Sequence, residues 1–257
     1  MTQVLGPQNP RIAELRRLIG RRSSRSAEVV LEGPRTVGEA IGAGVVPATV
    51  IVPEAAAHSP AVVAVAQRVE AEIEWLVVRD HVFEKLAPSA TPQPMLALVP
   101  RPEAVLPARL PADAVVLVLA DVGDPGNVGT LIRAADAVAA TAVVVAGGAD
   151  PWGPKAVRAS AGSVLRVPVV PFAEVGDAVE ALRSAGARIV GTDVRGGERH
   201  DGGVLGSPVA IVMGSEPHGL GDDVDVDAWC HIAMPGNAES LNVAMAGTLL
   251  LFEARRG

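Results

Sequence analysis

Short apolar runs alternate with amphipathic segments along the whole chain. Residues 9–20 place apolar side chains on one face and arginines opposite, which predicts an amphipathic helix closed by Gly20. The sequence that follows predicts strands at 27–33, 48–53, 74–78 and 95–100, separated by helices at 34–44, 59–72 and 79–87. Because helices and strands alternate, we expect a small α/β domain with a largely buried sheet.

The second part of the chain repeats this alternation with longer apolar runs. Residues 114–120, AVVLVLA, are continuously apolar, which is typical of a central parallel strand. Further strands are expected at 141–148, at 187–194, at 208–214 and at 230–235, and one more strand ends at residue 170. Helices are expected at 130–138, at 173–186 and at the C-terminal end. The pattern predicts a second α/β domain with a mostly parallel sheet.

A proline-rich segment separates the two parts. Prolines recur between Pro88 and Pro111, and residues 101–111, RPEAVLPARLP, show neither helical nor strand periodicity. We therefore place one domain at residues 1–105 and the other at 106–257.

Composition is that of a globular protein without a membrane anchor. The chain has 257 residues, of which 49% are hydrophobic, so it can bury a sizeable core. Its N-terminus has no signal-peptide pattern, and no apolar run approaches the roughly 20 residues that cross a bilayer. The single cysteine, Cys230, is interpreted as a packed small residue, and the lack of any internal disulfide fits a reducing cytoplasm. We expect a cytoplasmic protein.

Basic residues gather near the N-terminus although the net charge is −7. An acidic protein is not an obvious nucleic-acid binder, but a local basic face can still contact phosphates. A solvated helix face explains the same pattern equally well. The candidate RNA-binding residues are Arg16, Arg17, Arg21, Arg22 and Arg25.

Three segments of the second part share one design: an apolar run ends in Gly or Pro, carries polar side chains and passes into a helical pattern. They are residues 124–136, DPGNVGTLIRAAD, residues 212–220, VMGSEPHGL, and residues 232–246, IAMPGNAESLNVAMA. In an open α/β sheet, ligands bind at the carboxyl ends of strands. We therefore expect the three segments to form one composite site.

Each polar residue in these segments also has a purely structural interpretation. Asn127 and Arg133 are six residues apart, close to two helical turns, and Arg133 is either an anion-binding group or an ion-pair partner. Glu216 is either a functional carboxylate or a cap of the next helix, and Ser240 and Asn242 flank a helix start where N-capping is the simpler role.

Other kinds of site are disfavoured. The loop after residues 114–120 lacks both the G-x-G-x-x-G dinucleotide fingerprint and the G-K-[ST] of a P-loop, which argues against a nucleotide-dependent oxidoreductase. Asp223, Asp225 and Asp227 alternate as in a calcium loop, but the required Gly and the terminal Glu are missing. We expect no metal site.

The three segments resemble motifs 1, 2 and 3 of the SpoU class of RNA 2′-O-ribose methyltransferases in the SPOUT superfamily. The similarity spans about residues 114–256 in the correct order, and the E-S-L-N run within residues 239–242 is its most specific part. The resemblance implies a C-terminal trefoil-knot domain with a mostly parallel sheet. The segment VVLEGPRTVGEAI, residues 29–41, is more loosely similar to the L30e-like substrate-binding domain that often precedes it.

The resemblance also implies a cofactor and a set of site residues. S-Adenosylmethionine would be held mainly by backbone groups, at the positions Gly214, Ile232, Met234, Gly236 and Leu241. Arg133 would address the ribose 2′-hydroxyl, Asn127 and Asn242 would position the reactants, and Glu216 and Ser240 would hold the loops or the arginine. Arg133 is proposed as the base in this family, yet an arginine stays protonated at neutral pH, which equally favours a role as a phosphate clamp.

The same resemblance implies a homodimer that acts on RNA without a membrane or a metal. The final helix carries Leu241, Met245, Thr248, Leu249 and Phe252 on one face, which fits a buried interface. The domain order favours ribosomal RNA, most specifically 23S rRNA, over transfer RNA. A transfer-RNA 2′-O-methyltransferase and a catalytically weak RNA-binding or ribosome-assembly factor remain the alternatives.

Overall fold

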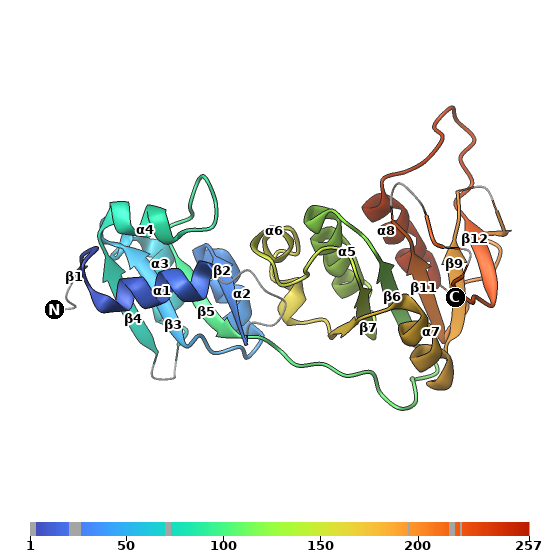
Figure 1. Cartoon of the computed structure of the whole chain (residues 1–257), viewed down its shortest axis with the longest axis horizontal. Helices are drawn as coiled ribbons and strands as arrows, with labels where there is room; N and C mark the ends of the chain where they lie inside the picture. The colour runs from blue at the N-terminus through green and yellow to red at the C-terminus, as the bar shows by residue number, and fades with distance from the viewer. Residues whose placement is uncertain are drawn as a thin grey trace. The chain divides into compact units, whose positions relative to one another are not determined.

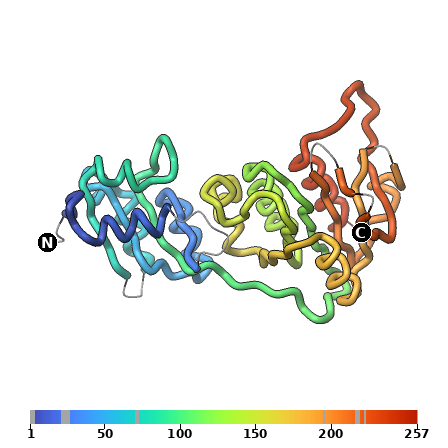
Figure 2. Tube along the Cα trace, viewed as in Figure 1, coloured from blue at the N-terminus to red at the C-terminus, as the bar shows by residue number. Residues whose placement is uncertain are grey.

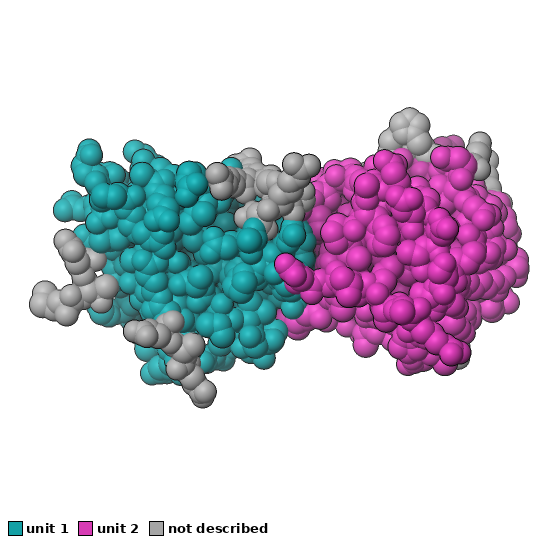
Figure 3. All heavy atoms as spheres, turned by 60° about the horizontal axis from the view of Figure 1, so that its bottom comes forward, with its two compact units in different colours: residues 1–102, 152–165 teal, residues 103–151, 166–257 magenta. Residues whose placement is uncertain are grey.

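The computed structural model describes residues 4–20, 27–69, 73–194, 196–215, 219–221 and 223–256. The chain forms two compact units, which Figure 3 shows in separate colours. The first consists of residues 1–102 and 152–165, and the second of residues 103–151 and 166–257. No helix of the described part of the chain is long and apolar enough to cross a bilayer.

The first unit is built on a five-stranded sheet in the order β1-β4-β3-β5-β2. Strand β4 pairs in parallel with both β1 and β3, whereas β5 is antiparallel to both β2 and β3. Apolar residues of α1, α4, β3 and β5 form a common core, which confirms a small α/β unit with a buried sheet. The strands are β1 (Val4–Leu5), β2 (Glu28–Glu32), β3 (Thr49–Pro53), β4 (Glu74–Val78) and β5 (Leu96–Pro100).

The helices of this unit match the predicted segments, with one shorter than expected. They are α1 (Pro10–Gly20), α2 (Pro34–Gly42), η1 (Glu54–Ala56), α3 (Pro60–Ala66) and α4 (Asp80–Leu86), and the short α6 (Pro154–Ala159) and η2 (Ser163–Leu165) cluster with them. The predicted helix 59–72 was too long: α3 ends at Ala66, and residues 67–69 are not helical although Val69 would continue the apolar face of Val62 and Val65.

The second unit contains a seven-stranded sheet in the order β10-β12-β9-β11-β6-β7-β8 (Figure 1). Every pair of neighbouring strands is parallel, so the predicted mostly parallel α/β fold is confirmed. The strands are β6 (Val115–Ala120), β7 (Ala142–Ala146), β8 (Val169–Phe172), β9 (Arg188–Thr192), β10 (Glu198–Arg199), β11 (Val209–Met213) and β12 (Ala228–His231). The helices are α5 (Pro125–Ala137), α7 (Val175–Ser184) and α8 (Val243–Ala254).

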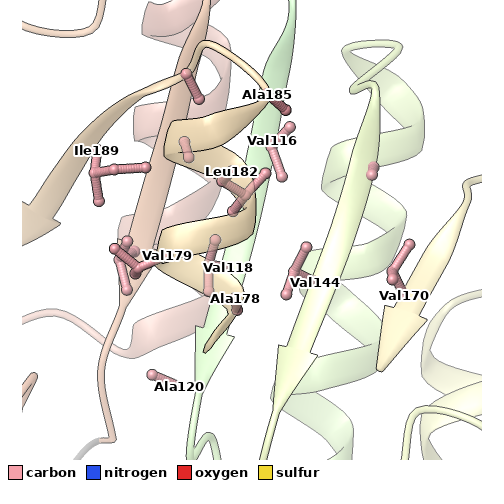
Figure 4. Packing of buried hydrophobic residues seen from close by; sticks show 14 of the residues in the cluster. Val116, Val118, Ala120, Val144, Val170, Ala178, Val179, Leu182, Ala185 and Ile189 are labelled. Carbon is pink, nitrogen blue, oxygen red and sulfur yellow. The ribbon is translucent and has the colours of Figure 1, made fainter. Parts of the chain in front are cut away.

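Helix α7 covers one face of this sheet. Figure 4 shows Ala178, Val179 and Leu182 of α7 directed toward alternate residues of the strands, among them Val116 and Val118 of β6. Successive residues of a strand point to opposite faces, so the remaining residues of β6 face the other side, where α8 contacts both β6 and β11. All residues of β6 are buried, which explains why its sequence is continuously apolar.

Helices α5 and α8 pack closely against each other although they lie far apart in the sequence (Figure 2). Gly247 of α8 lies at their contact, where a Cβ atom would collide with the side chain of Leu131 in α5. A glycine here lets the two helices approach. The packing therefore brings the N-terminal ends of both helices to the same edge of the sheet.

The last predicted strand is displaced from residues 230–235 to Ala228–His231. The physical reason is pairing: β12 follows β9 only as far as Cys230, opposite Thr192, because β9 ends there. The chain from Ile232 onward leaves the sheet and is available to line a site. Between the predicted strands 187–194 and 208–214, the chain also forms the two-residue strand β10, which pairs with β12.

Candidate functional site

A cavity of about 730 Å³ opens at the carboxyl ends of β9, β11 and β12. Its volume lies within the roughly 300–1,000 Å³ of small-molecule sites. The second and third predicted segments supply six of the sequence-predicted site residues to its lining, namely Gly214, Ile232, Met234, Ser240, Leu241 and Asn242. Two of the three segments that we expected to form one composite site therefore line a common cavity at the carboxyl edge of the sheet.

The first predicted segment contributes the start of α5 beside this cavity. Asp124 is the N-cap of α5, and its Oδ1 accepts hydrogen bonds from the backbone N–H groups of Gly126 at 2.7 Å and Asn127 at 3.0 Å. Pro125 follows as the first helical residue, where its missing N–H has no cost. These caps start α5 five residues earlier than predicted and place Asn127 in its first turn.

The second predicted segment makes a closed loop at the end of β11. Ser215 and Gly219 exchange two backbone hydrogen bonds, at 2.8 and 2.9 Å, and so bring the ends of this loop together. Gly214 lies directly beneath, where a Cβ atom would collide with the backbone of Gly219 and Leu220. Any other residue at position 214 would push the loop away from the cavity. Glu216, a predicted site residue, lies outside the described residues.

The third predicted segment ends at the N-cap of α8. Asn242 Oδ1 accepts hydrogen bonds from the backbone N–H groups of Ala244 at 2.9 Å and Met245 at 3.3 Å. The amide of the same side chain is used a second time, because Nδ2 donates to Asn127 Oδ1 at 3.2 Å. Asn242 thus has the predicted structural role and also joins the cavity wall to the first turn of α5.

Arg133 lies on α5 but does not line the cavity. Six helical residues rotate a side chain by about 600°, so Asn127 and Arg133 point about 120° apart around the helix. Arg133 is exposed, and among the described residues it makes no side-chain hydrogen bond or ion pair. Its guanidinium is therefore presented at the surface beside the site.

The carboxyl end of β9 supplies two lining residues that the sequence did not single out. Thr192 Oγ1 donates to the carbonyl of Val212 at 2.9 Å, which ties β9 to β11 at the cavity. Asp193 follows it and also lines the cavity. The signal was present, since the run ARIVGTDV ends in polar residues as the other strands do, but it lacks the Gly-rich turn and helix that marked the three segments.

Cys230 lines the base of the cavity and is 0% exposed. This confirms its interpretation as a packed small residue. Burial raises the pKa of its thiol to about 11, because a thiolate would lose its hydration there. The group is therefore neutral at physiological pH and contributes an apolar surface.

The remaining predicted residues lie away from the cavity or outside the described chain. Gly236 is exposed and does not line the cavity. Arg16 and Arg17 are exposed on α1, whereas Arg21, Arg22 and Arg25 lie outside the described residues. Within the described part of the chain, no three His, Cys, Asp or Glu side chains are grouped so as to hold a metal ion.

Comparison with known proteins assigns a family to each part of the chain. The SpoU rRNA Methylase family matches residues 114–252, which include all three segments of the site. The MRM3-like substrate binding domain matches residues 9–97.

Individual relatives extend this similarity to the whole length. The 23S rRNA (guanosine(2553)-2′-O)-methyltransferase RlmP of Bacillus subtilis is 28% identical over 99% of this chain and 100% of its own. The 23S rRNA (uridine(2479)-2′-O)-methyltransferase of Streptomyces viridochromogenes is 42% identical over 51% of this chain and 49% of its own. The crystal structure of the SpoU methyltransferase AviRb from Streptomyces viridochromogenes, in complex with the cofactor AdoMet, has a TM-score of 0.83 and 30% identity over 97% of this chain and 98% of its own.

Proposed function

The chain belongs to the SpoU rRNA Methylase family, and we propose that it transfers a methyl group from S-adenosylmethionine to a ribose 2′-hydroxyl of 23S ribosomal RNA. The full-length similarity to RlmP supports this reaction and this RNA, as does the similarity of the second unit to the uridine methyltransferase. The targets named for these two relatives differ in base, one a guanosine and the other a uridine, while the chemistry at the ribose is the same.

The cavity has the chemistry that the cofactor requires. An adenine needs an apolar slot with backbone donors and acceptors, and the lining combines apolar side chains such as Leu220 and Ile232 with the strand-end loops at Gly214 and Leu241. The AviRb structure, which is similar over nearly the whole chain, is a complex with AdoMet. When bound, the cofactor supplies a methyl group already activated on a sulfonium.

One observation carries the assignment of the reacting edge: the hydrogen bond from Asn242 to Asn127. Asn242 lines the cavity, and Asn127 belongs to the helix that carries Arg133. The bond therefore fixes the cavity wall against the helix that meets the RNA. Alignment of the 2′-oxygen with the methyl group is the main requirement for the transfer, since the donor needs no further activation.

Arg133 meets the RNA in this proposal. Its guanidinium is positively charged and exposed, and it has no side-chain ion pair among the described residues. Such a group binds a phosphate bidentately and orients the adjacent 2′-hydroxyl. The hydroxyl loses its proton as the methyl group arrives, and the phosphate or solvent takes it. Ser240, which lines the cavity, holds the loops around this edge, and the family resemblance assigns the same role to Glu216, which lies outside the described residues.

The first unit binds the RNA beyond the target nucleotide. It matches a substrate binding domain, and α1 exposes Arg16 and Arg17. Arg11 on the same helix instead forms ion pairs with Glu14 and Glu74. Arg11 therefore has a structural role, whereas Arg16 and Arg17 are available to bind phosphates. Arg21, Arg22 and Arg25 extend this available group along the sequence. The presence of this unit before the methyltransferase unit favours ribosomal RNA over transfer RNA.

A second copy of the chain completes the enzyme in this proposal. The outer face of α8 exposes apolar side chains one turn apart, with Met245 60%, Leu249 48% and Phe252 50% exposed. A stripe of this kind is typical of a protein interface. We place this homodimer in the cytoplasm, where ribosomes are assembled.

Methyl transfer from radiolabelled S-adenosylmethionine to 23S rRNA tests the proposal, with RNA from a host that lacks the endogenous methylation. The wild-type protein should label a single nucleotide, and mapping should identify it as a 2′-O-methyl ribose. If transfer RNA were labelled instead, the proposed substrate would be wrong and the protein would be a transfer-RNA methyltransferase. If the protein bound the cofactor but labelled no RNA, the result would support the alternative function, a ribosome-assembly factor of the same fold.

A further inference from the structure

Asp193 differs from the other residues of the cofactor cavity by its charge. Among the described residues that line the cavity, it is the only carboxylate, and Cys230 is the only other ionisable side chain. Asp193 directly follows β9, which none of the three family motifs includes. Its role is therefore not accounted for by the residues discussed above.

The Asp193 carboxylate is held in a defined position. Its Oδ1 accepts a hydrogen bond from the backbone N–H of Gly196 at 2.9 Å, and its own backbone N–H donates to the carbonyl of Cys230 at 3.0 Å. The first bond orients the side chain, and the second fixes its backbone against β12. A carboxylate positioned in advance binds a ligand without the full entropic cost of ordering it.

The position of Asp193 in the sheet tells which part of the cofactor it meets. Its backbone bond places it beside Cys230, and Ile232 follows two residues after Cys230 in the chain. Both Cys230 and Ile232 belong to the apolar part of the cavity lining, which suits an adenine. In the sheet, β11 lies between β9 and β6, the strand that leads to the helix that carries Asn127. In the cofactor, the ribose connects the adenine to the sulfonium.

We infer that the Asp193 carboxylate accepts hydrogen bonds from the ribose hydroxyls of the cofactor and thereby selects an adenosine-containing ligand. Adjacent hydroxyls offer two donors to a group that only accepts, and a charged acceptor makes such bonds stronger than a neutral one. The inference rests on the proposed use of S-adenosylmethionine. It adds a cofactor-binding residue to those that the motifs provide.

Equilibrium binding of 5′-methylthioadenosine tests the inference, because this ligand keeps the adenine and ribose but has neither the amino acid nor a charge. Asp193→Ala should weaken its binding by about 10-fold or more, and Asp193→Asn, which retains the acceptor for Gly196, should weaken it less. The 2′-deoxy and 3′-deoxy analogues should bind the wild-type protein more weakly. The Asp193→Ala substitution should weaken the binding of these deoxy analogues only slightly, because an analogue that lacks a hydroxyl has already lost its hydrogen bond to Asp193.

A matched control is Glu198→Gln, which removes one negative charge from the short strand β10 that follows Asp193 in the chain, and Glu198 does not line the cofactor cavity. It should bind both 5′-methylthioadenosine and S-adenosylmethionine as the wild type does, and thermal unfolding should show that every variant is folded.

Three outcomes would overturn the inference. Unchanged 5′-methylthioadenosine binding in Asp193→Ala, with weaker S-adenosylmethionine binding, would assign Asp193 to the amino acid end. An equal loss in Glu198→Gln would show a general charge effect instead of a contact. A wild-type protein that binds neither ligand would overturn the inference together with the proposed function, whereas the first two outcomes leave the proposed function intact.

Discussion

Asn242 donates a hydrogen bond from Nδ2 to Asn127 Oδ1 at 3.2 Å, while its own Oδ1 caps the helix that begins at the next residue. The two functions of one amide can be separated by substitution. Asn242→Ala removes both and should lower the free energy of unfolding by about 1 kcal/mol through loss of the cap. It should also reduce methyl transfer. Urea unfolding and a labelling assay measure the two effects.

Asn242→Ser is the matched variant for this pair. Serine is an effective N-cap but is too short to reach Asn127, so stability should stay close to that of the wild type while methyl transfer falls. Asn127→Ala should reduce transfer to a similar extent, because it removes the other partner of the same bond. If Asn242→Ser were fully active, the Asn242–Asn127 bond would have only a structural role.

Arg133 provides a test that separates RNA chemistry from cofactor binding. Arg133→Ala should reduce methyl transfer by about 100-fold or more, because the transition state loses a charge-assisted contact. Affinity for S-adenosylmethionine should be unchanged, since Arg133 does not line the cavity. Stability should change by less than about 0.5 kcal/mol, as expected for an exposed side chain.

Arg133→Lys distinguishes charge from geometry. Lysine keeps the positive charge but cannot form the planar, bidentate contact of a guanidinium. We expect its turnover to be close to that of Arg133→Ala. Near-normal turnover would contradict any role specific to arginine, whether as a base or as a bidentate clamp.

Gly214 and Gly236 are both predicted cofactor positions, but their surroundings in the structure differ. A Cβ atom at Gly214 would collide with the backbone of Gly219 and Leu220, so Gly214→Ala must displace the loop at the cavity mouth. A Cβ atom at Gly236 meets nothing within 4 Å. Calorimetry should therefore show much weaker S-adenosylmethionine binding for Gly214→Ala and unchanged binding for Gly236→Ala. Equal effects would mean that Gly236 contacts the cofactor after all.

Cys230 gives a prediction about pH. Burial raises its pKa from 9.0 to about 11 in the folded protein, so the unfolded chain loses this proton first as the pH rises. The folded state should therefore lose stability between pH 9 and about 11. Below pH 9 the thiol is protonated in both states and has no such effect. Cys230→Ala should be less stable at neutral pH, but its stability should decline less between pH 9 and 11 in urea unfolding experiments.

The strands of the second unit could be predicted from sequence because burial on both faces leaves a direct mark. β6 is continuously apolar for this reason, and β7 and β11 are similar. The end of β12 could not be predicted, because it depends on where its neighbour β9 stops. Pairing between distant segments has no local signature at Ile232, which is apolar both inside and outside a strand.

The site was predictable where a local pattern coincides with a strand end. Gly214 and Asn242 stand in turns that their sequence neighbours already indicate, and both line the cavity. Asp193 was missed because its importance comes from the sheet order, which places β9 between β11 and β12. Arg133 could be recognised by resemblance, but its outward direction follows from the packing of α5, which buries Leu131, Ile132 and Ala135.

The exposed stripe on α8 yields the last prediction. Leu249 is 48% exposed at its centre, between Met245 and Phe252. Leu249→Glu places a charge in the proposed interface, where it would be buried without a partner, and should convert a dimer into monomers at micromolar concentration. Arg256→Glu, just beyond the C-terminal end of α8 at an exposed polar position, should leave the dimer intact. Light scattering after gel filtration measures both masses. A wild-type protein that is monomeric in this assay would contradict the proposed interface, and a Leu249→Glu variant that stays dimeric would move it to another face.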